Sequence, residues 1–231
     1  PTRSTPRAKT YEPGLFSEIR DGWVRRTMRA RVADYTDRGE LAVSVLTWNV
    51  GAKKPPPAAQ MAELMAELTA SSRGCALLAV GLQESVELAA QNVGAGAGGP
   101  IVGGALAWEA AITRALIDGG GGGGGGGVDD PAGFVQLVCR QMMGIVLLVY
   151  ARRSLLPVCS AAPRTCSVGT GLLGLMGNKG AVAASLRVHS SSICLVCAHL
   201  ASGASAVEAR NLEYSQLMQR VAFPPAQGAR D

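Results

Sequence analysis

Six short, mainly apolar segments limit the folds that are open to this chain, because each is bounded by glycine, proline or polar residues. They comprise residues 41–48, 75–81, 134–140, 145–150, 180–188 and 193–199. Six to nine residues is the usual length of a buried strand and is short for a helix of a globular core. A polar turn at residues 189–192 separates the last two segments, so we expect them to pair as a hairpin.

Helical patterns lie between these expected strands. Apolar residues at the i, i+3, i+4, i+7 spacing predict helices over about 58–70, near 108–116 and over about 205–221. The first stripe consists of Met61, Leu64, Met65 and Leu68, and the third of Val207, Asn211, Tyr214, Met218 and Val221. Interleaved strands and helices place the chain in the mixed α/β (α+β) class.

Changes in composition divide the chain. Residues 1–38 hold nine basic side chains of a protein whose net charge is +5, and we interpret them as a basic linker, helix-compatible from residue 22. This segment either contacts an acidic partner or is simply a solvated flank. Residues 39–231 form the domain, interrupted at about 94–130 by a Gly-rich insertion that contains nine consecutive glycines and is expected to be flexible.

The sequence also bears on the compartment. No run approaches the roughly 20 apolar residues of a transmembrane helix, and the polar N-terminal residues are unlike a signal peptide. Most of the six cysteines lie in apolar segments, so we expect reduced core thiols in a cytoplasmic protein.

Polar and glycine-containing motifs follow the apolar segments. In chain order they are Thr47-Trp-Asn-Val-Gly51, Gly81-Leu-Gln-Glu84, Gly169-Thr-Gly-Leu-Leu-Gly-Leu-Met-Gly-Asn-Lys-Gly-Ala-Val182, Cys197-Ala-His-Leu-Ala-Ser-Gly203 and Arg210-Asn-Leu-Glu-Tyr214. Taken singly, Asn49 can cap a turn, Glu84 can be a surface carboxylate and His199 a core histidine. The glycine loop before Lys179 lets the backbone approach a phosphate, and the joint pattern favours phosphate chemistry.

In this order, the motifs resemble those of the magnesium-dependent inositol polyphosphate 5-phosphatases, a branch of the endonuclease/exonuclease/phosphatase superfamily. The resemblance covers roughly residues 40–221. It implies a DNase I-like two-sheet β-sandwich flanked by helices. The implied reaction is hydrolysis of the 5-phosphate of phosphoinositides such as phosphatidylinositol 4,5-bisphosphate, or of soluble inositol polyphosphates. It also implies peripheral contact with anionic membranes, and no nucleic-acid partner is expected.

The resemblance assigns a role to each residue near the reacting phosphate. Glu84 would bind Mg²⁺ directly, Asn49 would be a second oxygen donor, and Gln83 would orient Glu84. His199 would hydrogen-bond the scissile phosphate and stabilise its charge in the transition state.

Other residues would hold the substrate. Asn178 and Lys179 would bind a ring phosphate that is not cleaved, and Arg210 would support the phosphate pocket. Four apolar side chains of the glycine loop would either enter the lipid surface or pack in the core: Leu172, Leu173, Leu175 and Met176.

Two later motifs of the family, D-L-N and S-D-H, do not occur in this sequence. The family takes its general base from the first. We therefore expect the chain to be the N-terminal portion of a catalytic domain, truncated on its C-terminal side and inactive by itself. Two alternatives remain open: a phosphoinositide- or membrane-binding module without catalysis, and a nuclease of the same fold.

Overall fold

The computed structural model describes residues 13–70, 74–86, 103–117, 133–160, 162–170 and 179–224. The chain divides into two units, residues 1–40 and 41–231. In the first unit, helix α1 (Pro13–Ala30) is followed by the short helix α2 (Val32–Tyr35). The helix thus begins well before residue 22, where helical sequence was expected. None of the described helices is long and apolar enough to span a membrane.

The second unit contains a four-stranded sheet with the order β1-β2-β4-β3. Its strands are β1 (Val43–Asn49), β2 (Leu77–Gln83), β3 (Phe134–Met142) and β4 (Ile145–Arg152). Strands β1 and β2 are parallel, and the other pairs are antiparallel. Because β1 and β2 run the same way, the motifs that follow them meet at one edge of the sheet.

A second, antiparallel sheet has the order β5-β6-β7. Its strands are β5 (Arg164–Gly169), β6 (Gly180–Val188) and β7 (Ser191–His199), and β6 and β7 form the expected hairpin. Strand β5, which lacks an apolar run, and the preceding 3₁₀ helix η2 (Arg153–Val158), which is six residues long and contains a proline, were not expected.

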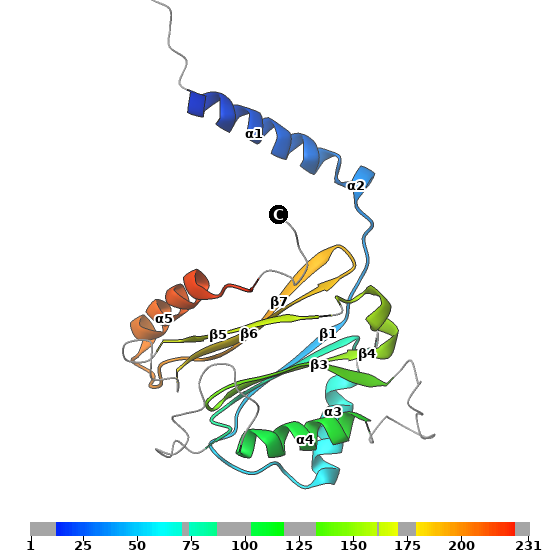
Figure 1. Ribbon diagram of the computed structural model, residues 1–231, viewed down its shortest axis with the longest axis vertical. Coiled ribbons are helices and arrows are strands. Elements are labelled where there is room, and N and C mark those ends of the chain that lie inside the picture. Colours follow the sequence, from blue (N-terminus) through cyan, green and yellow to red (C-terminus); the bar gives the residue numbers. More distant parts are fainter. Residues whose placement is uncertain are drawn as a thin grey trace, which may run out of the picture. The chain divides into compact units, whose positions relative to one another are not determined.

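The two sheets face each other, and helices cover their outer sides (Figure 1). Leu147 and Val149 of β4 pack against Val182 and Ala184 of β6 between the sheets. Helices α3 (Ala58–Thr69) and α4 (Gly104–Ile117) cover the four-stranded sheet, and α5 (Val207–Arg220) lies on the three-stranded one. The expected two-sheet sandwich with flanking helices is confirmed.

Helix α4 falls within the Gly-rich insertion expected at 94–130, so that range contains an ordered helix. Residues 94–102 and 118–130 lie outside the described part of the chain. Trp108 and Ile112 of α4 are about 1% exposed and pack with Met61 and Met65 of α3. The apolar spacing seen in the sequence is therefore the one that the two helices bury.

Two expectations about burial are wrong. Most of the apolar stripe predicted for α5 faces solvent: Val207, Tyr214 and Met218 are more than half exposed, while Val221 packs partly buried against the cluster of Leu217. Of the six cysteines, only Cys75 and Cys197 are buried. In both cases an apolar run or stripe was taken to indicate burial, but the strand or helix turns that side outward.

Candidate active site

Glu84 and Asn49 meet where the parallel strands β1 and β2 end. Asn49 pairs with Gln83 across the two strands, so Glu84 is the first residue beyond the sheet. Its φ of 54° lies in the left-handed region, which non-glycine residues rarely adopt. Asn49 Nδ2 donates to Glu84 Oε1 at 2.9 Å, and Asn49 Oδ1 accepts from the backbone N–H of Gly51 at 3.0 Å. The Asn49 amide is thereby oriented by the turn that follows β1.

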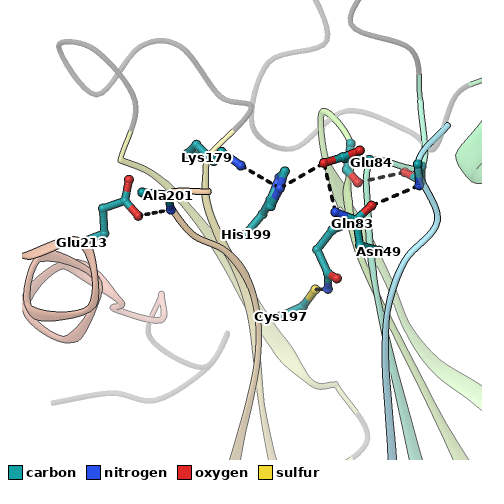
Figure 2. Close-up of polar contacts among 11 residues, drawn as sticks. Asn49, Gln83, Glu84, Lys179, Cys197, His199, Ala201 and Glu213 are labelled. Atoms are coloured by element: carbon teal, nitrogen blue, oxygen red, sulfur yellow. Dashed lines mark hydrogen bonds and ion pairs between the residues drawn. The ribbon is translucent and has the colours of Figure 1, made fainter. Parts of the chain in front are cut away.

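Lys179 and His199 approach this pair from the other sheet. Gly180 is paired with His199 across β6 and β7, which places Lys179 beside the imidazole. Lys179 Nζ lies 2.7 Å from His199 Nε2. On its other side, His199 Nε2 lies 3.5 Å from Glu84 Oε1. The four side chains thus form a row that runs from one sheet to the other (Figure 2).

The polar groups of this row have defined partners. An ammonium group only donates hydrogen bonds, so this contact with a protonated Lys179 requires His199 Nε2 to act as the acceptor. The His199 side chain is 14% exposed and that of Glu84 43% exposed. The Glu84 carboxylate is therefore the more solvent-accessible of these two groups.

Gln83 differs from its expected role. Its amide points away from Glu84 and donates to Thr47 Oγ1 at 3.2 Å, to the carbonyl of Gly81 at 3.3 Å and to Cys197 Sγ at 3.3 Å. Gln83 thus connects β2 with β7, two residues before His199. Burial raises the pKa of the Cys197 thiol to about 11, although the Gln83 hydrogen bond opposes that shift.

Sequence reasoning missed the part that Cys197 plays here. Cys197 is 5% exposed and faces Gly81, where an added Cβ would lie 2.9 Å from the sulfur. Residues two apart in a strand share a face, so the spacing of Cys197 and His199 was the available signal.

Arg210 contacts the backbone of the loop that follows His199. Its Nη1 donates to the carbonyl oxygens of Ala201, at 3.1 Å, and Gly203, at 2.7 Å, in the loop after β7. Glu213, which the motif analysis passed over, accepts from the backbone N–H of Ala201 at 2.6 Å. Substrate contact by Arg210 stays a prediction, because its guanidinium is engaged with this loop.

Five of the predicted site residues lie outside the described part of the chain: Asn178, Leu172, Leu173, Leu175 and Met176. The structure therefore brings together Asn49, Glu84, Lys179 and His199, as their positions at strand ends led us to expect. The chemical roles assigned to them remain predictions.

A cavity of about 300 Å³ is lined by Ser85, the residue that follows Glu84 in the chain, by Lys53 and Lys54 of the loop after β1, and by the first residues of α4. Trp108 holds this loop, because its Nε1 donates to the carbonyl of Lys53 at 2.9 Å.

The donor set suits a hard divalent cation. Glu84 supplies a half-exposed carboxylate, and the oxygen of the neighbouring Asn49 amide is held at the same strand end. Mg²⁺ is usually bound by one or two carboxylates, with waters and substrate phosphates as its other ligands. Among the described residues no cluster of three or more His, Cys, Asp or Glu side chains could hold a metal ion.

Comparison with known proteins gives a consistent picture. Residues 46–231 match the model of endonuclease/exonuclease/phosphatase family 2. The type IV inositol polyphosphate 5-phosphatase 9 of Arabidopsis thaliana is 31% identical over 191 residues, which cover 79% of this chain and 44% of that protein. The type I inositol polyphosphate 5-phosphatase 8 of the same plant is 29% identical, covering 94% of this chain and 51% of that protein.

Among solved structures, the inositol polyphosphate 5-phosphatase domain of SPsynaptojanin, in complex with inositol (1,4)-bisphosphate and calcium ion, has a TM-score of 0.64. It is 23% identical and covers 92% of this chain and 54% of that one. The likeness shows the same fold. This chain spans about half the length of these relatives.

Proposed function

This chain belongs to the endonuclease/exonuclease/phosphatase superfamily and to its inositol polyphosphate 5-phosphatase branch, and from that premise we propose that its site acts on 5-phosphorylated inositol headgroups. The matches confirm the resemblance drawn from the motifs. The proposed substrates are phosphoinositides such as phosphatidylinositol 4,5-bisphosphate, or soluble inositol polyphosphates. The observation that carries the proposal is the row of carboxylate, imidazole and ammonium groups joined across two sheets.

Each group of the row has a task in this proposal. Glu84 and Asn49 would hold Mg²⁺, which when bound polarises a phosphate and neutralises its charge. Lys179 would turn its ammonium from His199 to a phosphate oxygen. His199 Nε2 would then be free to carry a proton and donate it as a hydrogen bond to the phosphate, next to the negative charge of Glu84.

Hydrolysis also needs a group that activates water. The resemblance would take that base from a D-L-N motif, which this sequence does not contain. Glu213, the carboxylate of α5 that lies next to the β7 loop, is bound to the Ala201 N–H. We therefore propose that this sequence alone binds inositol phosphates, and that rapid turnover is a property of the full-length gene product.

The first unit supports a proposed contact with anionic membranes at the cytoplasmic face. Phe16, Ile19 and Trp23 of α1 are each more than half exposed, and the same helix carries four arginines. Exposed apolar side chains together with basic ones are typical of helices that lie in a membrane interface.

The test is phosphate release by the full-length gene product from inositol 1,4,5-trisphosphate and from vesicles containing phosphatidylinositol 4,5-bisphosphate. We expect release with MgCl₂ and none with EDTA. Glu84→Gln, which keeps the shape but removes the charge, should lower kcat by at least about 100-fold, the scale of losing one transition-state charge contact. Glu63→Gln on the exposed face of α3 is the matched control. Metal-independent release, or an unaffected Glu84→Gln variant, contradicts the proposal.

The missing D-L-N motif favours a second candidate, a module that binds phosphoinositides without cleaving them. Lys179-dependent binding by a full-length product that releases no phosphate would support it. Nicking of plasmid DNA by the same product would instead point to a nuclease.

A further inference from the structure

We propose that helix α5 acts as a brace for the site, with Arg210, Glu213 and Arg220 as positioning residues that set the contact between Lys179 and His199. The functional meaning of this brace rests on the function proposed above. Its structural basis consists of side chains of one helix that bind backbone groups at two separate strand ends.

The first strand end is that of β7. Ala201, two residues after His199, is bound on both sides: Glu213 accepts from its N–H at 2.6 Å, and Arg210 donates to its carbonyl at 3.1 Å. Arg210 also donates to the Gly203 carbonyl at 2.7 Å. Figure 2 shows the Glu213 contact with Ala201. Together with the Arg210 contacts it holds the two peptide planes around Ala201, which restricts the direction in which the chain leaves His199.

The second strand end is that of β5. Arg220 Nη1 donates to the carbonyl of Gly169 at 2.8 Å. Gly169 is paired with Gly180, and the N–H of Thr170 donates to the carbonyl of Lys179 at 3.0 Å. Arg220 therefore acts on the strand that holds the backbone of Lys179.

Helix α5 makes only a small buried apolar contact with the three-stranded sheet. Its polar contacts are therefore important for holding it in place. Leu217 is its buried residue, 3% exposed, and it packs with Val168 and Ala181. Leu217 is thus the one fully buried point at which α5 is attached, and Ala198, Leu200 and Val221 pack against this cluster only partly buried. The polar contacts lie on both sides of that point, with Arg210 and Glu213 before Leu217 and Arg220 after it.

The consequence for the site follows from distance. Lys179 Nζ and His199 Nε2 are 2.7 Å apart, and their backbones are held from opposite ends of α5. A shift of roughly 1 Å in a positioning element is enough to cost about 100-fold in rate. The brace would keep the ammonium and the imidazole directed at the same inositol headgroup, each at its own phosphate.

Side-chain ¹⁵N NMR tests the brace without depending on turnover. The chain has two histidines, and His189 lies at the opposite end of the β6–β7 hairpin from His199, so it is an internal reference. In the intact chain, Lys179→Met should shift the His199 Nε2 resonance. In Glu213→Ala and Arg220→Met chains that contact is loosened, so the same Lys179→Met change should shift Nε2 by less than half as much.

The controls separate positioning from general stability. Glu208→Ala removes an exposed carboxylate of the same helix and should leave the His199 resonance unchanged. Glu213→Gln keeps an acceptor oxygen for the Ala201 N–H and should restore most of the wild-type response. Should Glu213→Ala fail to fold, Glu213→Gln and Arg220→Lys replace it. In these milder variants the Lys179→Met change should shift the His199 Nε2 resonance by an amount between those of the intact and the disrupted chains.

A kinetic arm uses the full-length gene product. Arg220→Met should lower kcat for phosphate release about tenfold, with a smaller effect on KM. The reason is that this variant misplaces Lys179 and His199, whose contacts with the phosphates are made in the transition state. An unchanged His199 resonance and an unchanged Lys179→Met shift in folded Glu213→Ala and Arg220→Met chains would overturn the brace. A product that releases no phosphate, yet shows the NMR effect, would overturn the proposed function and leave the brace standing.

Discussion

At the scale of single residues, the site depends on close fits between the two sheets. Cys197 lies against Gly81, and its sulfur accepts a hydrogen bond from the Gln83 side-chain amide. His199 follows two residues later on the same strand. Gly180 has a φ of +143°, and a Cβ there would lie 2.9 Å from both Gly169 Cα and Met142 Cε. Small side chains at these positions let the sheets bring the polar row together.

The buried thiol of Cys197 makes stability dependent on alkaline pH. Its pKa is raised from 9.0 to about 11, so the folded state favours the neutral thiol, and that stabilisation is complete below pH 9 and lost as pH rises through 11. We expect the free energy of unfolding to fall by up to about 3 kcal/mol between pH 8 and pH 11 on account of this thiol. Urea denaturation of Cys197→Ala should show a smaller fall over that range. Equal losses in both proteins would contradict the assignment.

The backbone at Gly180 gives a second prediction. Gly180→Ala should lower the free energy of unfolding by about 2–4 kcal/mol, because alanine is strained at this backbone φ and its methyl group would clash with neighbouring atoms. Denaturant unfolding measures this loss. Gly22→Ala in α1, where a Cβ meets nothing within 4 Å, is the control and should change the main transition little.

At the scale of elements, α5 is a helix that the sequence pattern predicts correctly, although the same pattern points to the wrong buried face. Its apolar stripe through Val207, Tyr214 and Met218 has the helical spacing, yet these residues are exposed. The packed side is defined instead by Leu217 and by the polar contacts of Arg210 and Glu213. Polar side chains that bind backbone leave no signal in a hydrophobic pattern.

Substitutions on the two faces of α5 distinguish the alternatives. Leu217→Ala should cost about 2–4 kcal/mol of unfolding free energy, because it leaves a cavity against Val168 and Ala181. Met218→Ala, at 52% exposure, should cost less than about 0.5 kcal/mol. Thermal or denaturant unfolding compares them, and a larger loss for Met218→Ala would restore the stripe predicted from the sequence.

At the scale of the whole molecule, the core belongs to one of the two units. The hydrophobic clusters are built from residues between Leu41 and Val221, and the described residues of α1 contribute none of them. Stability and membrane contact can therefore reside in different parts of the chain.

Deletion of residues 1–40 tests this separation. We expect the Tm of residues 41–231 to change by less than about 2 °C, because no core side chain is removed. Sedimentation with anionic vesicles should fall several-fold, because the exposed apolar residues and arginines of α1 are lost. Calorimetry and vesicle sedimentation measure the two effects. A large drop in Tm would show that α1 stabilises the second unit.

The sequence by itself determined most of the strands and helices, the order of the motifs and the family, because periodicity and motif order are local properties of the chain. It also placed Asn49, Glu84 and His199 at strand ends. Strand β5, which lacks an apolar run, stayed hidden, as did the packed face of α5.

Only the tertiary structure decided which groups meet. Gln83 and Cys197 are 114 residues apart in the chain, and their contact depends on the packing of two sheets. The same holds for Lys179, His199 and Glu84, whose atoms come together through strand register and sheet packing. Contacts between distant segments depend on the relative placement of whole elements, which a local pattern does not carry.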